Sequence, residues 1–216
     1  MVKIVIPARK GSKGLPGKNR SLFDATARII PKSLRGEDII VTTDDEEISL
    51  MSDMYEFDSF DRPEILAQDN SSIKDVLVNV IESEVMHKDT IIIMLYLTYP
   101  ERTWEDVQDA LDWFINNDAR SMLCKQPVLS NPYLCMLENG NYGNQIVPHD
   151  YYRRQDYPKV FEISHFIFIS YASEIYHLNN NLYNADTMFY DIGRVHDIDT
   201  TKDLMEYEKS IDHITG

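Results

Sequence analysis

The sequence predicts an α/β fold with three layers, in which helices flank a mostly parallel sheet. Two observations support this prediction. Residues 90–97 (TIIIMLYL) are continuously apolar, which is typical of a central parallel strand that is buried on both faces. Over the first 120 residues, short apolar runs alternate with segments such as 72–86, whose apolar residues follow the period of a helix. This alternation predicts βαβ units and therefore parallel strands.

Local signals predict the remaining elements. The sequence pairs Asp44 with Glu47 and Thr103 with Asp106 have the spacing of a capping box, so a helix is expected to start at each pair. The other expected strands are residues 3–6, 38–43, 163–170 and 195–199, and the other expected helices are residues 22–34, 44–54, 103–116 and 200–211.

The 216 residues are expected to form a single domain with an inserted arm around 121–160. Turn-forming pairs interrupt the arm at 131–132, 139–140 and 142–143. Its apolar and aromatic side chains are typical of a surface that packs against another subunit. The sequence therefore predicts a homodimer that forms through a small dimerisation excursion.

Charge is distributed unevenly along the chain. With 21 Lys and Arg against 36 Asp and Glu, the net charge is −15, which argues against binding of nucleic acid or of an anionic membrane. Residues 1–36 nevertheless hold nine basic residues and one acidic residue. A basic segment in an acidic protein predicts a discrete anion site, and a solvated basic surface is the alternative.

Several other classes are excluded. The two cysteines form no metal-ligand pattern or disulfide framework, and the six histidines lack the spacing of a zinc helix. The first apolar run has only about five residues, which is too short for a signal peptide or a membrane span. We therefore expect a cytoplasmic protein.

The most informative segment is the basic, glycine-rich loop at residues 7–19 (PARKGSKGLPGKN). It leaves the carboxyl end of the first strand, where open parallel sheets bind ligands. Its glycines allow backbone amides to approach an anion, and its basic side chains add charged donors. The spacing fits neither a Walker A loop nor the dinucleotide-binding fingerprint. The loop predicts an anion site, and a generic basic turn is the alternative.

This loop resembles the signature of the CMP-sugar synthetases, or acylneuraminate cytidylyltransferases, which couple CTP to a sugar acid and release pyrophosphate. Further similar segments occur in the family's order: VTTDDEEI at 41–48, RPEILAQDNSSI at 62–73, TYPERT at 98–103, RRQDYPKVFE at 153–162 and HDIDT at 196–200. The resemblance implies a Rossmann-like nucleotidyltransferase fold, CTP and a sugar acid as substrates, and Mg²⁺ as cofactor.

The resemblance also implies the residues of the nucleotide site. These are Arg9, Ser12, Lys13, Gly14, Lys18, Asn19, Arg62 and Ser72. Arg9 and Lys18 are implied to be catalytic, because cations at these positions would stabilise charge on the α-phosphate and on the leaving pyrophosphate. As alternatives, Arg62 packs a loop before Pro63, and Ser72 only caps a helix. A capping serine can do both, since a helix N-terminus is itself an anion site.

Asp197 and Asp199 are the candidate metal ligands. In an extended strand their side chains project to the same face, and two carboxylates with phosphate oxygens and water suit Mg²⁺. The alternative is that Asp199 caps the last helix. In the resembled family this Asp-x-Asp binds the metal, which favours the first interpretation.

The sugar site is implied at Arg154, Gln155 and Tyr96. The fork of an arginine suits a carboxylate, which favours Arg154 facing the sugar acid. On this side the chain departs from the family pattern, because Tyr96 replaces a Gln and Leu134 stands near an expected Lys.

A second departure lies before the late strand, where Ser164 and His165 replace an Asn-Gly pair. The sugar half is therefore altered while the nucleotide half is kept. The leading hypothesis is Mg²⁺-dependent cytidylyl transfer from CTP to a nonulosonate or octulosonate. The alternative is a CTP-binding, non-catalytic relative that acts as a binding or regulatory module. Transfer onto a sugar 1-phosphate fits less well, because that superfamily's loop has a different pattern.

Overall fold

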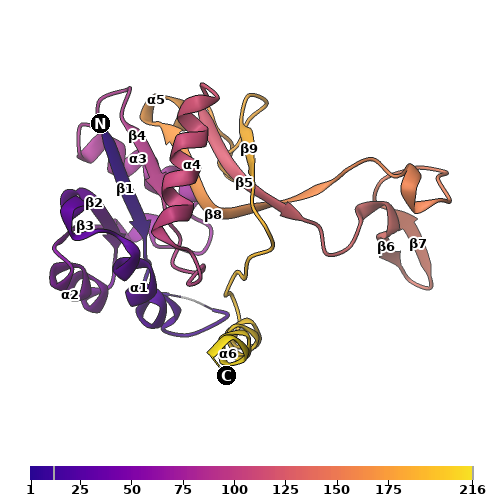
Figure 1. Cartoon of the computed structure of the whole chain (residues 1–216), viewed down its shortest axis with the longest axis horizontal. Helices are drawn as coiled ribbons and strands as arrows, with labels where there is room; N and C mark the ends of the chain where they lie inside the picture. Colours follow the sequence, from indigo (N-terminus) through magenta and orange to yellow (C-terminus); the bar gives the residue numbers. More distant parts are fainter. Residues whose placement is uncertain (12, 216) are drawn as a thin grey trace.

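The computed structural model describes residues 1–11 and 13–215, with side chains described to residue 209, and its described part contains a seven-stranded sheet (Figure 1). The spatial order is β3-β2-β1-β4-β8-β5-β9. The strands are β1 (Val2–Pro7), β2 (Gly36–Thr43), β3 (Phe57–Asp61), β4 (Ile91–Met94), β5 (Ser121–Pro127), β8 (Phe161–Tyr171) and β9 (Met188–Asp191). Strand β8 is antiparallel to β4 and β5, and the other neighbours in the sheet are parallel.

Helices cover both faces of this sheet, so the predicted three-layer, mostly parallel architecture is confirmed. The helices α1 (Lys18–Ile29), α2 (Glu46–Met54) and α4 (Trp104–Asn116) contribute to one apolar core, and α3 (Ile73–Ser83) and α5 (Ala172–Ile175) contribute to the other. Successive residues of a strand point to opposite faces. In β1, Ile4 and Ile6 accordingly enter the first core, and Val5 enters the second.

The first helix begins earlier than predicted. It starts at Lys18 rather than near residue 22, and it ends at Ile29 rather than near residue 34. Gly17 makes this start possible, because it adopts a left-handed conformation with φ of 71°, which glycine tolerates without a Cβ clash. The basic loop therefore runs directly into the N-terminus of α1.

The cap of the second helix is one residue later than predicted. Asp45, not Asp44, accepts a hydrogen bond from the backbone N–H of Glu47 at 3.1 Å. The capping box of Thr103 and Asp106 at α4 is confirmed.

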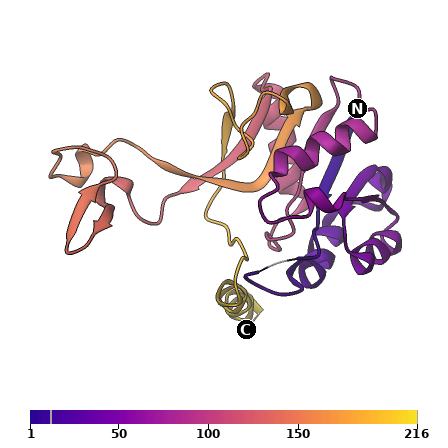
Figure 2. The ribbon, with the colours of Figure 1, turned by 180° about the vertical axis from the view of Figure 1, so that it is seen from behind.

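Two edge strands were not predicted, and one predicted strand is absent. β3 (FDSFD) has no continuous apolar run and β9 (MFYD) has one of only three residues, so their sequences give little signal. Residues 195–199 lie outside the described sheet and are held by individual bonds, such as that from Ile198 N–H to the Thr98 carbonyl at 2.9 Å. The last helix, α6 (Thr201–Thr215), follows directly and lies beside the loop before α1 (Figures 1 and 2).

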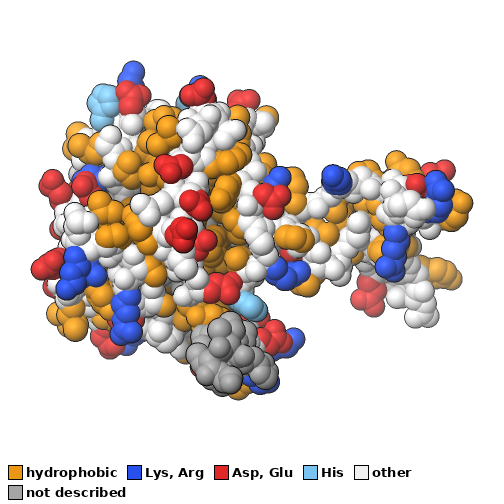
Figure 3. Space-filling view, in the orientation of Figure 1, with side chains coloured by type: hydrophobic (Ala, Val, Ile, Leu, Met, Phe, Trp, Pro, Cys, Tyr) orange, Lys and Arg blue, Asp and Glu red, His pale blue; other side chains and the backbone are white. Residues whose placement is uncertain are grey.

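The predicted arm is shorter than 121–160, because its first seven residues form β5 inside the main sheet. Residues 128–160 project from the body. The hairpin of β6 (Met136–Asn139) and β7 (Tyr142–Gln145) lies in the part of this projection that is farthest from the sheet (Figure 1). Hydrophobic side chains are visible along this projection (Figure 3). Among the described residues, no helix is both long enough and apolar enough to span a bilayer.

Candidate active site

A cavity of about 550 Å³ lies where β1, β3 and β4 end. This is the edge at which open parallel sheets bind ligands. Seven of its lining residues belong to the predicted nucleotide and metal sets: Arg9, Lys18, Asn19, Arg62, Ser72, Asp197 and Asp199. Segments far apart in the sequence therefore meet in one cleft.

Backbone and side-chain hydrogen bonds fix the start of the basic loop. The Ala8 N–H donates to the Thr42 carbonyl at 3.0 Å, and the Lys10 N–H donates to Asp44 Oδ1 at 2.7 Å. From the other side, Asn19 Nδ2 donates to the Arg9 carbonyl at 2.8 Å. Asn19 thus holds the loop from the first turn of α1, and Arg9 starts from a fixed backbone.

The end of the loop is the N-terminus of α1. Its first turn carries no acidic residue, and Lys18 is its first residue, so the helix dipole and a lysine act on the same space. Gly14 packs against the Asp199 backbone, and a Cβ at Gly14 would lie well under 3.0 Å from the Asp199 carbonyl oxygen. The glycine therefore allows the loop to approach the segment that carries both candidate metal ligands.

Carboxylates already neutralise the loop's cations. Lys18 Nζ lies 2.7 Å from Asp199 Oδ1, and Arg9 Nη1 lies 2.8 Å from Asp69 Oδ1. Lys13 also forms an ion pair with Asp69. Ser12 falls outside the described residues, so its predicted role stays a prediction.

Arg62 is a buried cation beside the cleft. Its Nη2 donates to the Thr42 carbonyl at 2.8 Å, and no carboxylate among the described residues forms an ion pair with it. Burial lowers the pKa of the guanidinium to about 10, and Asp44 acts in the opposite direction. An arginine in this setting, charged and only partly hydrogen-bonded, favours an anionic or carbonyl ligand in the cleft.

Ser72 has the capping role that was its alternative interpretation. Its Oγ accepts from the Asp75 N–H at 3.1 Å at the start of α3. It also lines the cleft, and its predicted contact with the nucleotide stays a prediction.

Asp199 does not cap the last helix. The Asp203 N–H donates to Thr200 Oγ1 at 3.3 Å, and Asp203 Oδ2 accepts from the Thr200 N–H at 2.7 Å, so Thr200 is the cap. The Asp199 side chain is left facing Lys18. The capping alternative for Asp199 is therefore wrong.

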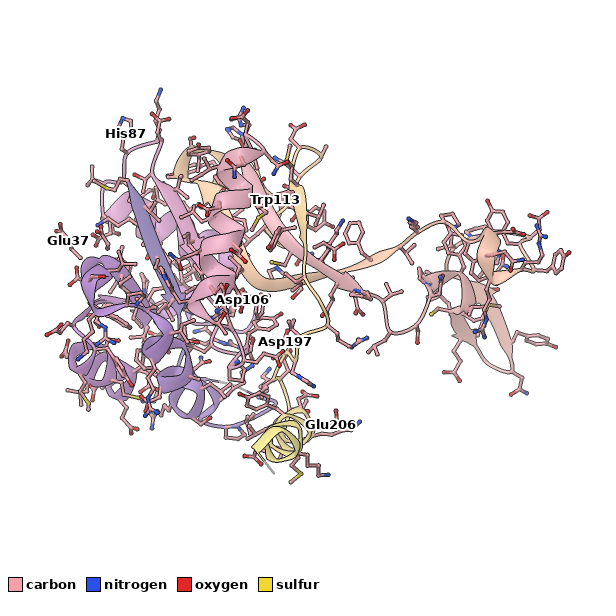
Figure 4. All side chains as sticks on the ribbon, viewed as in Figure 1. Glu37, His87, Asp106, Trp113, Asp197 and Glu206 are labelled. Carbon is pink, nitrogen blue, oxygen red and sulfur yellow. The ribbon has the colours of Figure 1, made fainter. Side chains whose placement is uncertain are left out.

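Asp197 lies on the segment that leads from β9 to α6 (Figure 4). Its Oδ2 accepts from the Tyr99 hydroxyl at 2.8 Å. The walls of the cleft reduce its hydration and raise the pKa of its carboxyl, and the nearby charge of Asp199 acts in the same direction. Hydrogen bonds from Thr98 and Tyr99 oppose this shift.

Asp197 and Asp199 suit a magnesium ion better than a metal that is coordinated only by protein side chains. The described residues contain no group of three or more His, Cys, Asp or Glu that could hold a metal. Mg²⁺ usually takes one or two carboxylates and completes its shell with phosphate oxygens and water. Asp197 and Asp199 share the cleft with the basic loop, and the charge of Asp199 adds to the burial that raises the pKa of Asp197.

The far side of the cleft is aromatic and neutral. Tyr96 packs edge-on against His165 with ring centroids 5.8 Å apart, and His165 Nε2 lies 3.4 Å from the Asn181 carbonyl. Burial lowers the pKa of His165. Asn180 and Asn181 line this side too, and sequence reasoning missed them because they lie in a loop without a motif.

The structure does not bring Arg154 and Gln155 to this cleft. They lie in a short 3-10 helix (Arg154–Asp156) on the projecting arm, and both are exposed. Leu134 is on the same arm. Within one chain, the predicted sugar-binding set is therefore divided between the cleft and the arm.

Proteins of known name resemble this chain over most of its length. The N-acylneuraminate cytidylyltransferase of Streptococcus agalactiae serotype V is 27% identical over 216 residues, covering 93% of this chain and 51% of that protein. The CMP-N,N'-diacetyllegionaminic acid synthase of Legionella pneumophila is 27% identical over 222 residues, covering 95% and 94%. The chain spans about half the length of the S. agalactiae relatives. No protein-family model matches it.

A solved structure of CMP:2-keto-3-deoxy-manno-octonic acid synthetase complexed with CTP superposes with a TM-score of 0.68. It covers 98% of both chains at 17% identity, so it supports the fold alone. The fold is therefore that of the Rossmann-like nucleotidyltransferases. The resemblance to the CMP-sugar synthetases that was noted in the sequence is confirmed by these named relatives.

Proposed function

We propose that this protein catalyses Mg²⁺-dependent cytidylyl transfer from CTP to a sugar acid, a nonulosonate or octulosonate, giving a CMP-sugar and pyrophosphate. The observation that carries the proposal is the meeting of Arg9, Lys18 and Arg62 with Asp197 and Asp199 in one cleft. Cations, a buried arginine and two carboxylates are what a nucleoside triphosphate with a bound metal requires.

The protein's part in such a reaction is mainly positioning and charge neutralisation. An acceptor hydroxyl forms a bond to the α-phosphorus, and the bond from that phosphorus to the β-phosphate bridging oxygen breaks. Arg9 and Lys18 neutralise the charge that develops on the phosphates. Arg62 and Ser72 bind the nucleoside end, which leaves the side of Tyr96 for the acceptor.

Asp197 and Asp199 would hold the magnesium ion, which supplies charge stabilisation to the phosphates and orients them. In the structure, Lys18 balances the charge of Asp199 at 2.7 Å. Lys18 would neutralise phosphate charge from its place beside Asp199.

The division of the sugar-binding set supports a homodimer in which the arm completes the cleft of another copy. The described acceptor side offers phenols, amides and a histidine with a lowered pKa, but a sugar carboxylate needs a cation. Arg154 is exposed on the arm, among apolar side chains such as Leu134 at 53% and Leu137 at 59% exposure. Such a surface is suited to burial against a second subunit.

The reaction is tested by incubating the protein with CTP, Mg²⁺ and a panel of sugar acids and measuring pyrophosphate. Turnover with one of them is expected. Absence of product with every nonulosonate and octulosonate would contradict the proposal.

The homodimer is tested by light scattering and by mixing inactive variants. Arg154→Ala and Lys18→Ala subunits should each be inactive alone, but mixed dimers should regain activity because one of the two clefts then has both residues. A monomer at micromolar concentration, or no recovery on mixing, would contradict contributions across the interface.

A second candidate is a CTP-binding module without transferase activity. The Tyr96–His165 contact favours it, because these two aromatic rings replace the residues that the resembled family places on the sugar side. Isothermal titration separates the two candidates. Tight CTP binding without a sugar-dependent product would favour the binding module.

A further inference from the structure

Asp69 lies across the cleft from the basic loop and binds two of its cations. Its Oδ1 accepts from Arg9 Nη1 at 2.8 Å, and its Oδ2 forms an ion pair with Lys13. Hydrogen bonds from Lys13 and Arg9 hold the pKa of the Asp69 carboxyl below its ordinary value. One carboxylate therefore engages both cations at once, as a phosphate group would.

On each side of this contact, side-chain hydrogen bonds to backbone carbonyls hold the segment in place. Asp69 lies in a turn between the 3-10 helix η2 (Glu64–Leu66) and α3. In that turn Ser71 Oγ donates to the Ile65 carbonyl at 2.7 Å, and Gln68 Nε2 donates to the Glu64 carbonyl at 3.1 Å. Arg9 is held from the other side by Asn19. The contact thus joins two braced segments that line the same cleft.

A polyphosphate at the loop would meet this carboxylate as a like charge. Asp69 is half-exposed. Its carboxylate nevertheless lies in direct contact with Arg9 and Lys13, the cations that a phosphate would bind. A bound polyphosphate must therefore either break the contacts of Asp69 with Arg9 and Lys13 or lie close to a carboxylate that repels it.

We propose that Asp69 is an internal counter-ion that competes with polyphosphate for Arg9 and Lys13 and so sets the affinity of the loop. The identity of the nucleotide rests on the proposed function, but the competition depends only on the ligand's phosphates. Exposed ion pairs contribute little to folding, so removal of Asp69 leaves the fold intact.

The test compares three variants by titration calorimetry without Mg²⁺, with inorganic tripolyphosphate and with CTP as separate ligands. Asp69→Asn keeps the shape of the side chain and removes its charge, whereas Asp69→Glu keeps the charge. Asp53→Asn removes an exposed carboxylate on α2, away from the cleft, and so controls for net charge.

Asp69→Asn is expected to bind tripolyphosphate about 3- to 10-fold more tightly than the unchanged protein, because two partly exposed ion pairs no longer compete. Asp69→Glu and Asp53→Asn should stay within about twofold, and the gain should shrink at high salt.

Equal or weaker tripolyphosphate binding by Asp69→Asn would overturn the inference and make Asp69 an organiser of the loop. If neither the unchanged protein nor Asp69→Asn binds tripolyphosphate, the inference is also overturned. If Asp69→Asn gains affinity for tripolyphosphate while no form binds CTP, Asp69 is the proposed counter-ion and the proposed nucleotide is wrong.

Discussion

The two halves of the cleft differ in how their side chains are held and charged. On the side of the basic loop, Arg9, Lys13 and Lys18 each form an ion pair, and Asn19 and Asp44 brace the loop that carries them. On the acceptor side, an aromatic contact and a single long hydrogen bond hold His165, and its burial disfavours charge. Among the described residues, the cations therefore gather on the loop side of the cleft, whereas Tyr96 and His165 form an aromatic side.

The largest expected effect concerns the candidate metal ligand Asp199. Asp199→Asn should lower the rate of cytidylyl transfer at least about 100-fold, because a bound metal supplies several kcal/mol of transition-state stabilisation. CTP binding without Mg²⁺ should be unchanged or slightly tighter, since Lys18 loses its partner. Steady-state rates and calorimetry measure both quantities.

Asp186→Asn is the matched control for this change, because it removes an exposed carboxylate outside the cleft. Full Mg²⁺-dependent activity in Asp199→Asn would remove the metal assignment and leave only the basic loop.

Lys18→Ala tests the contribution of Lys18 to the charged half of the cleft. Loss of a charge-assisted contact of about 1.5–3 kcal/mol should weaken CTP binding about 10- to 150-fold, with or without metal. Lys202→Ala, on the exposed face of α6, should have no comparable effect. Equal affinity of Lys18→Ala and Lys202→Ala for CTP would contradict the role of Lys18.

Gly14→Ala tests the close contact between the basic loop and the backbone of Asp199. The added methyl group would collide with the Asp199 carbonyl, so a loss of about 1–3 kcal/mol in unfolding free energy is expected. A Cβ at Gly11 would meet nothing within 4 Å, so Gly11→Ala should unfold at nearly the same denaturant concentration as the unchanged protein. Similar unfolding of the two variants would show that the loop moves away at no cost.

The smallest expected effect concerns the neutral half. Burial lowers the pKa of His165 in the folded state, so below its ordinary value near 6.5 the unfolded chain binds more protons. Stability should therefore be complete above that pH and decline as the pH falls toward the lowered pKa.

His165→Phe should lose part of this pH dependence, which thermal unfolding between pH 7.5 and 5 would measure. An unchanged pH profile in His165→Phe would show that other groups cause the decline.

Prediction from sequence succeeded where the signal is local and repeated. The continuous apolar run of β4 and the helical period of α3 gave the correct layers, and the Thr103–Asp106 pair gave a correct cap at α4. It failed at edge strands β3 and β9, and at Asp44, where adjacent aspartates have equal capping propensity and tertiary contacts decide between them.

The sequence by itself determined the layered α/β architecture and the concentration of cations in one loop, because strand length, helix period and charge are properties of neighbouring residues. Only the tertiary structure decided which carboxylate meets which cation. Asp69 and Asp199 lie 60 and 181 residues from the cations they bind, and no local pattern encodes such a distance. The same holds for Arg154, whose place on the arm depends on where β5 leaves the sheet.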